Sequence, residues 1–261
     1  MVLTLNVILF LTLHLLPGMK SSMVNLINNG YDGTVIAINP SVPEDEKLIQ
    51  NIKEMVTEAS TYLFHATKRV YFRNVSILIP MTWKSKSEYL MPKQEAHDQA
   101  DVIVANSYLK YGDDPHTLQH GKCGEKGQYI HFTPNFLLTN NLPIYGSGRV
   151  FVHEWAHLRW GIFDEYNVDQ TVYISRRNTI EATRCSTHIT GINVVFKKCQ
   201  GGSCITRPCR RDSTRLYEAK CIFIPEKSHT ARESIMFMQS LHSVTEFCTE
   251  KRHDTEAPNL Q

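Results

Sequence analysis

A pentapeptide of fixed spacing, His153-Glu154-Trp155-Ala156-His157, limits what this chain can fold into more than any other feature. In an α-helix of about 3.6 residues per turn, positions four apart lie on one face, so both histidines can bind one metal ion. Glu154 points to a different side, from which it can reach a water molecule at that metal. The spacing predicts a helix that carries a zinc site with its own general base.

The residues on either side of the motif favour such a helix. Gly146-Ser147-Gly148 comes before it, and we predict Ser147 or Gly148 as the N-cap. Gly161 follows and can end the helix, because glycine adopts a left-handed conformation at little steric cost. The apolar side chains between these ends suit a mostly buried helix. The alternative interpretation is an amphipathic helix whose histidines lie on the surface.

An acidic pair after the glycine completes the predicted site. A catalytic zinc ion holds three protein ligands and keeps one position open. Asp164 and Glu165 come where the chain can double back towards the helix. We therefore predict three zinc ligands, with Glu165 as the alternative third one, and a single general base: His153, His157 and Asp164 as the ligands, and Glu154 as the base.

The first residues have the composition of a secretory signal peptide. Residues 2–16 form an apolar run, and residues 17–22 are small or polar. We predict a signal peptide over residues 1–21, with cleavage near Ser21 or Ser22. A signal anchor is the alternative, but the run is shorter than the roughly 20 apolar residues of a membrane span. No later segment is apolar enough to cross a bilayer, so we expect a secreted, extracellular protein without a transmembrane span.

The cysteines agree with an oxidising compartment, where thiols form disulfides. The chain has 7 of them, and all but Cys123 fall in its last third. Six cysteines allow fifteen pairings, so the connectivity stays open. Because the total is odd, at least one thiol is free, bonded to another chain or without its partner. The disulfide candidates are Cys185, Cys199, Cys204, Cys209, Cys221 and Cys248.

Surface chemistry argues against one class of partner and predicts one modification. A formal net charge of +2 gives no basis for binding nucleic acid or a membrane surface. Asn74-Val75-Ser76 matches the N-glycosylation acceptor, which a secreted protein presents to the transferase. The alternative is an asparagine embedded in a strand, where the enzyme never reaches it.

Patterns along the chain predict strands and one long helix before the motif. An amphipathic helix begins near Pro43 and ends near Thr67, with apolar residues at helical spacing. Residues 110–127 are predicted as a loop, in which His116 and His120 are favoured as solvated side chains over metal ligands. The predicted strands cover residues 33–39, 70–80 and 101–106, with a short edge strand at 129–132.

The order of these elements is that of the upper half of a zincin fold. We predict an α+β, zincin-like domain related to metzincins, over residues 22–184, in which a mixed sheet packs over the H-E-x-x-H helix. The cysteine-rich segment, residues 185–250, would complete the lower half with a strand at 216–223 and a short helix at 239–249. Residues 251–261 are polar and would form a loose tail.

Longer stretches of the chain resemble the calcium-activated chloride channel regulator (CLCA) family. The likeness rests on the signal peptide, on Gly30-Tyr31-Asp32-Gly33, on the H-E-x-x-H-x-x-x-G-x-x-D-E pattern that begins at His153, and on the cysteine-rich segment that follows. The resemblance implies secreted or surface-associated glycoproteins with an N-terminal metallohydrolase domain. Such proteins cleave themselves and raise calcium-activated chloride conductance by acting on channel proteins.

The resemblance carries the family's zinc motif onto residues already singled out. Its ligands fall on His153, His157 and Asp164, and its base falls on Glu154. The site also resembles that of metzincins, and their methionine turn corresponds to Met236, which would lie beneath the metal. A core methionine is the alternative interpretation of that residue.

Length is where the chain departs from the family. Family members continue into a von Willebrand factor A domain with a metal-dependent adhesion site, whereas this chain ends at Gln261. We therefore expect a short member truncated after the metallohydrolase and cysteine-rich regions, without the calcium or magnesium adhesion site and the downstream self-cleavage site.

Two hypotheses about function follow. In the first, the chain is a secreted zinc metalloendopeptidase that cuts a peptide or protein and modulates calcium-activated chloride conductance, with a chloride channel protein as its partner. In the second, it is a non-catalytic secreted regulatory or vestigial fragment.

Overall fold

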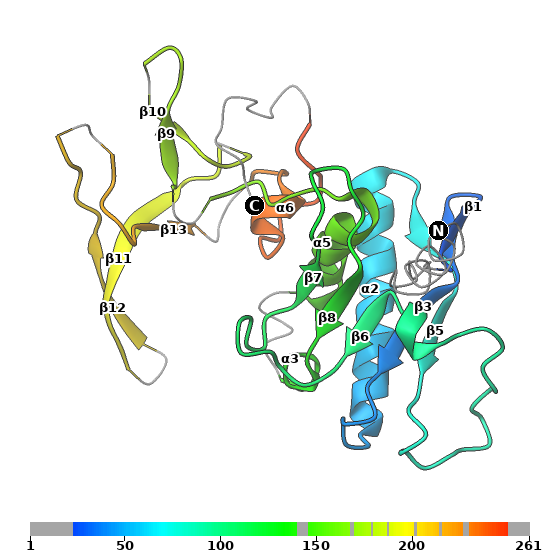
Figure 1. Ribbon diagram of the computed structural model, residues 1–261. Coiled ribbons are helices and arrows are strands. Elements are labelled where there is room, and N and C mark those ends of the chain that lie inside the picture. The colour runs from blue at the N-terminus through cyan, green and yellow to red at the C-terminus, as the bar shows by residue number, and fades with distance from the viewer. Residues whose placement is uncertain are drawn as a thin grey trace, which may run out of the picture.

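A mixed sheet on a pair of helices forms the main body of the protein (Figure 1). The computed structural model describes residues 23–139, 146–167, 170–178, 180–186, 188–200, 203–213, 216–226 and 230–249. The predicted signal peptide and the predicted tail lie outside the described residues. The α+β class is confirmed.

The main sheet has five strands in the order β5-β3-β6-β8-β7. The first four are parallel, and β7 pairs with β8 in the antiparallel direction. Their bounds are Thr34–Ile38 for β3, Val75–Leu78 for β5, Val102–Val104 for β6, His116–Leu118 for β7 and Tyr129–Phe132 for β8. The strands predicted at 33–39 and 101–106 are thereby confirmed as β3 and β6.

Two predictions about the edge of this sheet are wrong. The strand at 129–132 is β8, which lies inside the sheet because β7 covers its outer side. The strand β7 falls in the predicted loop, and it forms the edge next to β8. Its three residues, His116, Thr117 and Leu118, are too few and too polar to show the alternation that marks a strand.

The predicted long strand at 70–80 is two strands in different sheets. β4, Tyr71–Phe72, joins a small sheet with β1, Asn25–Ile27, and β2, Gly30–Asp32, whereas β5 joins the main sheet. The chain passes between the two sheets at Arg73 and Asn74, where both N–H groups donate to Tyr31 O. Asn74 is exposed there, outside any strand.

We predict that Asn74 carries an N-linked glycan when the chain is made in secreting cells. Its exposed side chain between β4 and β5 is open to the transferase, which needs an accessible acceptor. Treatment with an N-glycosidase should lower the mass of the wild-type chain. The same treatment should leave Asn74→Gln unchanged, and a wild-type chain of unmodified mass would contradict the prediction.

The helix α2, Glu46–Thr67, begins three residues after the predicted proline. Asp45 is its N-cap, because its carboxylate accepts a hydrogen bond from Lys47 N at 2.8 Å. Lys68 ends the helix in a left-handed conformation. The buried face recurs at helical spacing and includes Leu48, Ile52, Met55, Ala59, Tyr62 and Leu63.

The motif helix α5, Ser147–Trp160, packs directly on α2. Its N-cap is Gly146, with φ 61°, rather than Ser147 or Gly148 as predicted. Gly148 is instead the point of closest approach, since a Cβ there would lie 2.5 Å from Ala59 N. Trp155, inside the motif, is fully buried against Phe72 with ring centroids 4.8 Å apart. This anchor fixes the rotation of α5 about its axis.

The described part of residues 172–225 forms small sheets away from the main body (Figure 1). One sheet is a pair of strands, and the other has the order β12-β11-β13. The strand predicted at 216–223 overlaps only the start of β13. The remaining elements are β9, Val172–Ile174; β10, Ile180–Ala182; β11, Gly191–Gln200; β12, Ser203–Pro208; β13, Ile222–Pro225; and the short helices η1, His97–Gln99, α3, Pro134–Leu138, and α6, Ile235–Met238.

The helix predicted at 239–249 is wrong. Only α6 is helical here, and turns follow it. Arg149 explains the difference, because its Nη1 donates to the carbonyl oxygens of Gln239, Leu241 and Val244 at 3.2, 3.0 and 2.6 Å. A cation that collects these carbonyls replaces the helical hydrogen bonds that they would otherwise accept.

Disulfides stabilise the last third, as the cysteine pattern predicts. Cys185 pairs with Cys248, and Cys209 pairs with Cys221. Cys204 is also disulfide-bonded, and Cys123 is free and exposed. Within the described residues, no helix combines the length and the apolar character needed to cross a membrane.

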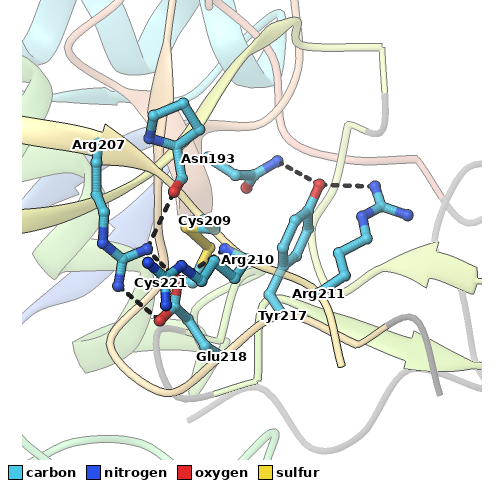
Figure 2. Close-up of a disulfide and its surroundings, with 9 residues drawn as sticks. Asn193, Arg207, Cys209, Arg210, Arg211, Tyr217, Glu218 and Cys221 are labelled. Carbon is cyan, nitrogen blue, oxygen red and sulfur yellow. Dashed lines mark hydrogen bonds and ion pairs between the residues drawn. A yellow bond between two sulfur atoms is a disulfide. The ribbon is translucent and has the colours of Figure 1, made fainter. Parts of the chain in front are cut away.

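Figure 2 shows how Glu218 organises the loop that the Cys209–Cys221 disulfide closes. Its carboxylate accepts two hydrogen bonds from the Arg207 guanidinium and one from Arg210 N at 2.7 Å. These contacts, led by the hydrogen bonds from Arg207, lower the pKa of Glu218 to about 2. The loop is therefore held by a charged pair as well as by its disulfide.

Candidate metal centre

Three side chains from α5 and the segment after it converge on one point. The Nε2 atoms of His153 and His157 lie 3.1 Å apart. Asp164 Oδ1 lies 3.1 Å from His153 Nε2 and 3.4 Å from His157 Nε2. All three potential ligand atoms are within 4.8 Å of one another. The structure thus brings together the ligand trio proposed from the sequence.

Gly161 makes this convergence possible. It ends α5 with φ 63°, and its N–H donates to Ala156 O and His157 O. A Cβ at this position would lie 2.2 Å from Glu125 O, so both the conformation and the space require glycine. The chain then doubles back and brings Asp164 to the histidines.

Glu165, the alternative third ligand, faces a different group. Its carboxylate accepts a hydrogen bond from the Ser234 hydroxyl, and its N–H donates to Met236 O at 3.0 Å. Its carbonyl accepts from Cys185 N at 3.0 Å. Glu165 therefore ties the segment that carries Asp164 to α6 and to the Cys185–Cys248 disulfide, and it is not part of the converging trio.

Backbone carbonyls orient both imidazoles. His153 Nδ1 lies 3.0 Å from Ile235 O, and His157 Nδ1 makes a short contact with Ile162 O. We assign each Nδ1–H as the donor, which leaves each Nε2 lone pair for a metal ion. Metal-binding histidines generally show this arrangement.

The electrostatics of the trio are those of a site for a cation. Burial opposes a charge on His153, but its hydrogen bond to Asp164 and the charges of Glu154 and Asp164 outweigh burial and raise the pKa of His153 to about 9. Burial also opposes a charge on Asp164, yet the two histidines hold its pKa well below its ordinary value. The pocket favours a positive charge, which a metal ion can supply in place of the imidazole proton.

Glu154 lies in the same cavity as the trio, a space of about 460 Å³. Thr117 Oγ1, on β7, lies 2.8 Å from Glu154 Oε2. His116 and His120 also line the cavity. His116 lies on the strand β7 and not in a loop as predicted. Other residues that line the cavity include Tyr111, Thr117, Phe163 and Tyr166, to which the sequence analysis gave no role.

The segment around Met236 connects both sides of the centre. Met236 is buried in the main core, and its N–H donates to Ser234 Oγ at 2.9 Å. The neighbouring Ile235 O accepts from His153, and Met236 O accepts from Glu165. Met236 thus lies in α6, which is hydrogen-bonded to His153 on one side and to Glu165 on the other.

The donor set suits Zn²⁺. Two imidazole nitrogens and one carboxylate oxygen are the ligands of many catalytic zinc sites, where a fourth position stays open. Asp164 Oδ1 is buried and faces the Nε2 atoms of both histidines. A metal ion would satisfy this oxygen.

Comparison with known proteins adds an independent line of argument. The sequence model described as "Calcium-activated chloride channel N terminal" matches residues 24–261. Calcium-activated chloride channel regulator 1 of Bos taurus is 89% identical over 100% of this chain and 29% of its own length. Regulator 3A-1 of Mus musculus is 74% identical over 98% of this chain and 29% of its length, and regulator 4 of Homo sapiens is 57% identical over 97% and 28%.

These matches concern the sequence alone. No solved structure matches the chain. The chain spans less than a third of the length of the curated relatives. Since the family model covers almost all of the sequence, the chain belongs to the calcium-activated chloride channel regulator family.

Proposed function

We propose that the chain is a zincin-like, zinc-dependent metallopeptidase domain of a secreted protein that modulates calcium-activated chloride conductance. One observation carries the enzymatic part: His153, His157 and Asp164 converge in the same cavity as the Glu154 carboxylate. The regulatory part rests on the relatives, which are named calcium-activated chloride channel regulators.

The arrangement around the site supports a zincin-like fold. The motif helix α5 packs against β8 and the edge strand β7 of a mixed sheet, and β7 runs antiparallel to β8. A glycine turn at Gly161 then returns the chain with the third ligand. These are the relations that we expect between sheet, helix and ligand segment in such an enzyme.

The chain's own residues can perform the proton transfers of peptide hydrolysis. Zinc held by the trio would polarise the peptide carbonyl and lower the pKa of a water molecule. Glu154 would take a proton from the attacking water and return it to the leaving amine. The edge strand β7 forms one wall of the cavity and offers an extended peptide a strand to pair with. A peptide or protein substrate fits this wall.

The disulfides support secretion. Cys185–Cys248 and Cys209–Cys221 persist only where thiols are not kept reduced, as in the secretory pathway and outside the cell. The apolar run at the start of the sequence supports the same localisation.

Two measurements on the purified chain test the enzymatic proposal. Metal analysis should give one zinc ion per chain, and a peptide library should be cleaved in a way that a chelator abolishes. One zinc ion without any cleavage would favour the non-catalytic regulatory protein instead. A chain that binds no zinc would overturn the proposed site.

We expect Asp164→Ala to weaken zinc binding by more than about 100-fold. Loss of a ligand should exceed the 10–100-fold effect that is typical of changes outside the ligand set. A competition titration against a chelating dye measures the affinity. Asp98→Ala is the matched control, because Asp98 is an exposed carboxylate on η1 outside the site. Equal affinities for the two variants would show that Asp164 is not a ligand.

A further inference from the structure

A single hydroxyl group holds the side chain of Glu154. Thr117 Oγ1 lies 2.8 Å from Glu154 Oε2 and 2.9 Å from Glu154 O. Both acceptors belong to the same glutamate, and a carboxylate is a stronger acceptor than a backbone carbonyl. The hydroxyl therefore holds Oε2, and the other carboxylate oxygen, Oε1, is the one that can receive a proton.

The backbone fixes Thr117 in position. Thr117 lies opposite Ile130 in the pairing of β7 with β8. Gly127 lies next to Thr117 and is fixed to α5, because its N–H donates to Leu158 O at 3.0 Å. A Cβ on Gly127 would lie 2.7 Å from Thr117 Cγ2, so the missing side chain makes room for the threonine methyl group. With the methyl group placed there, the hydroxyl faces α5.

We propose that Thr117 is a positioning residue that orients the Glu154 carboxylate for proton transfer. This inference rests on the proposed peptidase function, in which Glu154 is the base. Within the described residues, the Thr117 hydroxyl bonds to Glu154 and not to the proposed ligands, so its effect should fall on the chemical step and not on metal binding. The edge strand β7, which would pair with a peptide substrate, then also aligns Glu154, the base that acts on that peptide.

The chain offers variants that separate the hydroxyl from the shape of the side chain. Thr117→Val keeps the shape and removes the hydroxyl, whereas Thr117→Ser keeps the hydroxyl. Thr117→Ala is a second deletion that adds no bulk, in case the valine variant does not fold. Thr61→Val is the matched control, because the Thr61 hydroxyl is exposed and bonds to Thr57 O of its own helix, outside the site.

The first measurement is peptide hydrolysis by the zinc-loaded chain. We expect Thr117→Val to lower kcat about 10–100-fold, the usual effect of losing an outer partner in such a site. KM and zinc affinity should stay at their wild-type values, Thr117→Ser should restore kcat, and Thr61→Val should have no effect. Wild-type kcat in both hydroxyl deletions would overturn the proposal.

The second measurement needs no turnover. Crystal structures of the zinc-loaded wild type and Thr117→Val should show the Glu154 carboxylate displaced in the variant. An unchanged carboxylate would overturn the inference, even in a chain that cuts no peptide. A displaced carboxylate in a protein whose wild type is inactive would support the positioning role, and only the proposed peptidase function would then fail.

Discussion

Replacing Glu154 with glutamine should lower the rate of peptide cleavage by orders of magnitude and leave zinc in place. The amide keeps the size of the carboxylate but cannot accept the proton of the attacking water, and general acid–base catalysis contributes about 10²–10⁴-fold to such reactions. We expect kcat to fall by that factor with an unchanged zinc content. Cleavage by the purified variant, followed with a fluorogenic peptide, measures the effect.

The control for this variant is Glu54→Gln. Glu54 is an exposed carboxylate on α2, and it should be replaceable without loss of activity. Cleavage at the wild-type rate by Glu154→Gln would contradict the mechanism and assign the proton transfer to another group.

The same variant separates the two parts of the proposed function. Applied to cells that carry calcium-activated chloride currents, the wild-type chain should change the current. If the change requires proteolysis, Glu154→Gln should have no effect. If the variant acts like the wild type, regulation depends on binding, and the non-catalytic alternative becomes the better description of the chain.

Much of the site could be predicted because its determinants are local. The spacing of His153 and His157 follows from the helical repeat, and Gly161 ends α5 as its lack of a side chain allows. Trp155 is buried because the motif helix needs one apolar face. The histidine spacing, the end of the helix and the burial of Trp155 depend on residues close together in the sequence, so a sequence pattern is enough to predict them.

The remainder depends on contacts between distant segments. Asp164 and Glu165 are both carboxylates after the same glycine, and the choice between them is made by Ser234, which lies about 70 residues away and binds Glu165. Thr117 gives no signal of its own, because its role arises only when β7 pairs with β8 and lies against α5. The helix expected at 239–249 fails for the same reason, since Arg149 collects its carbonyl groups.

Removing the Cys185–Cys248 disulfide should give the largest loss of stability and should also weaken zinc binding. The bond spans 63 residues, and the entropy of closing such a loop corresponds to about 4 kcal/mol of the free energy of unfolding. Cys185 N donates to Glu165 O, next to Asp164 in the chain. The double variant Cys185→Ser/Cys248→Ser should therefore loosen the third ligand.

The second disulfide provides the matched control. Cys209–Cys221 spans only 12 residues, for which the same entropy gives about 3 kcal/mol, and it closes the loop between β12 and β13, outside the proposed ligand set. Urea unfolding and zinc titration of both double variants separate the two effects. Zinc affinity should fall only when Cys185–Cys248 is removed. An equal fall in both variants would show that the disulfides act through general stability, and that Asp164 is held by Gly161 and the Glu165–Ser234 contact alone.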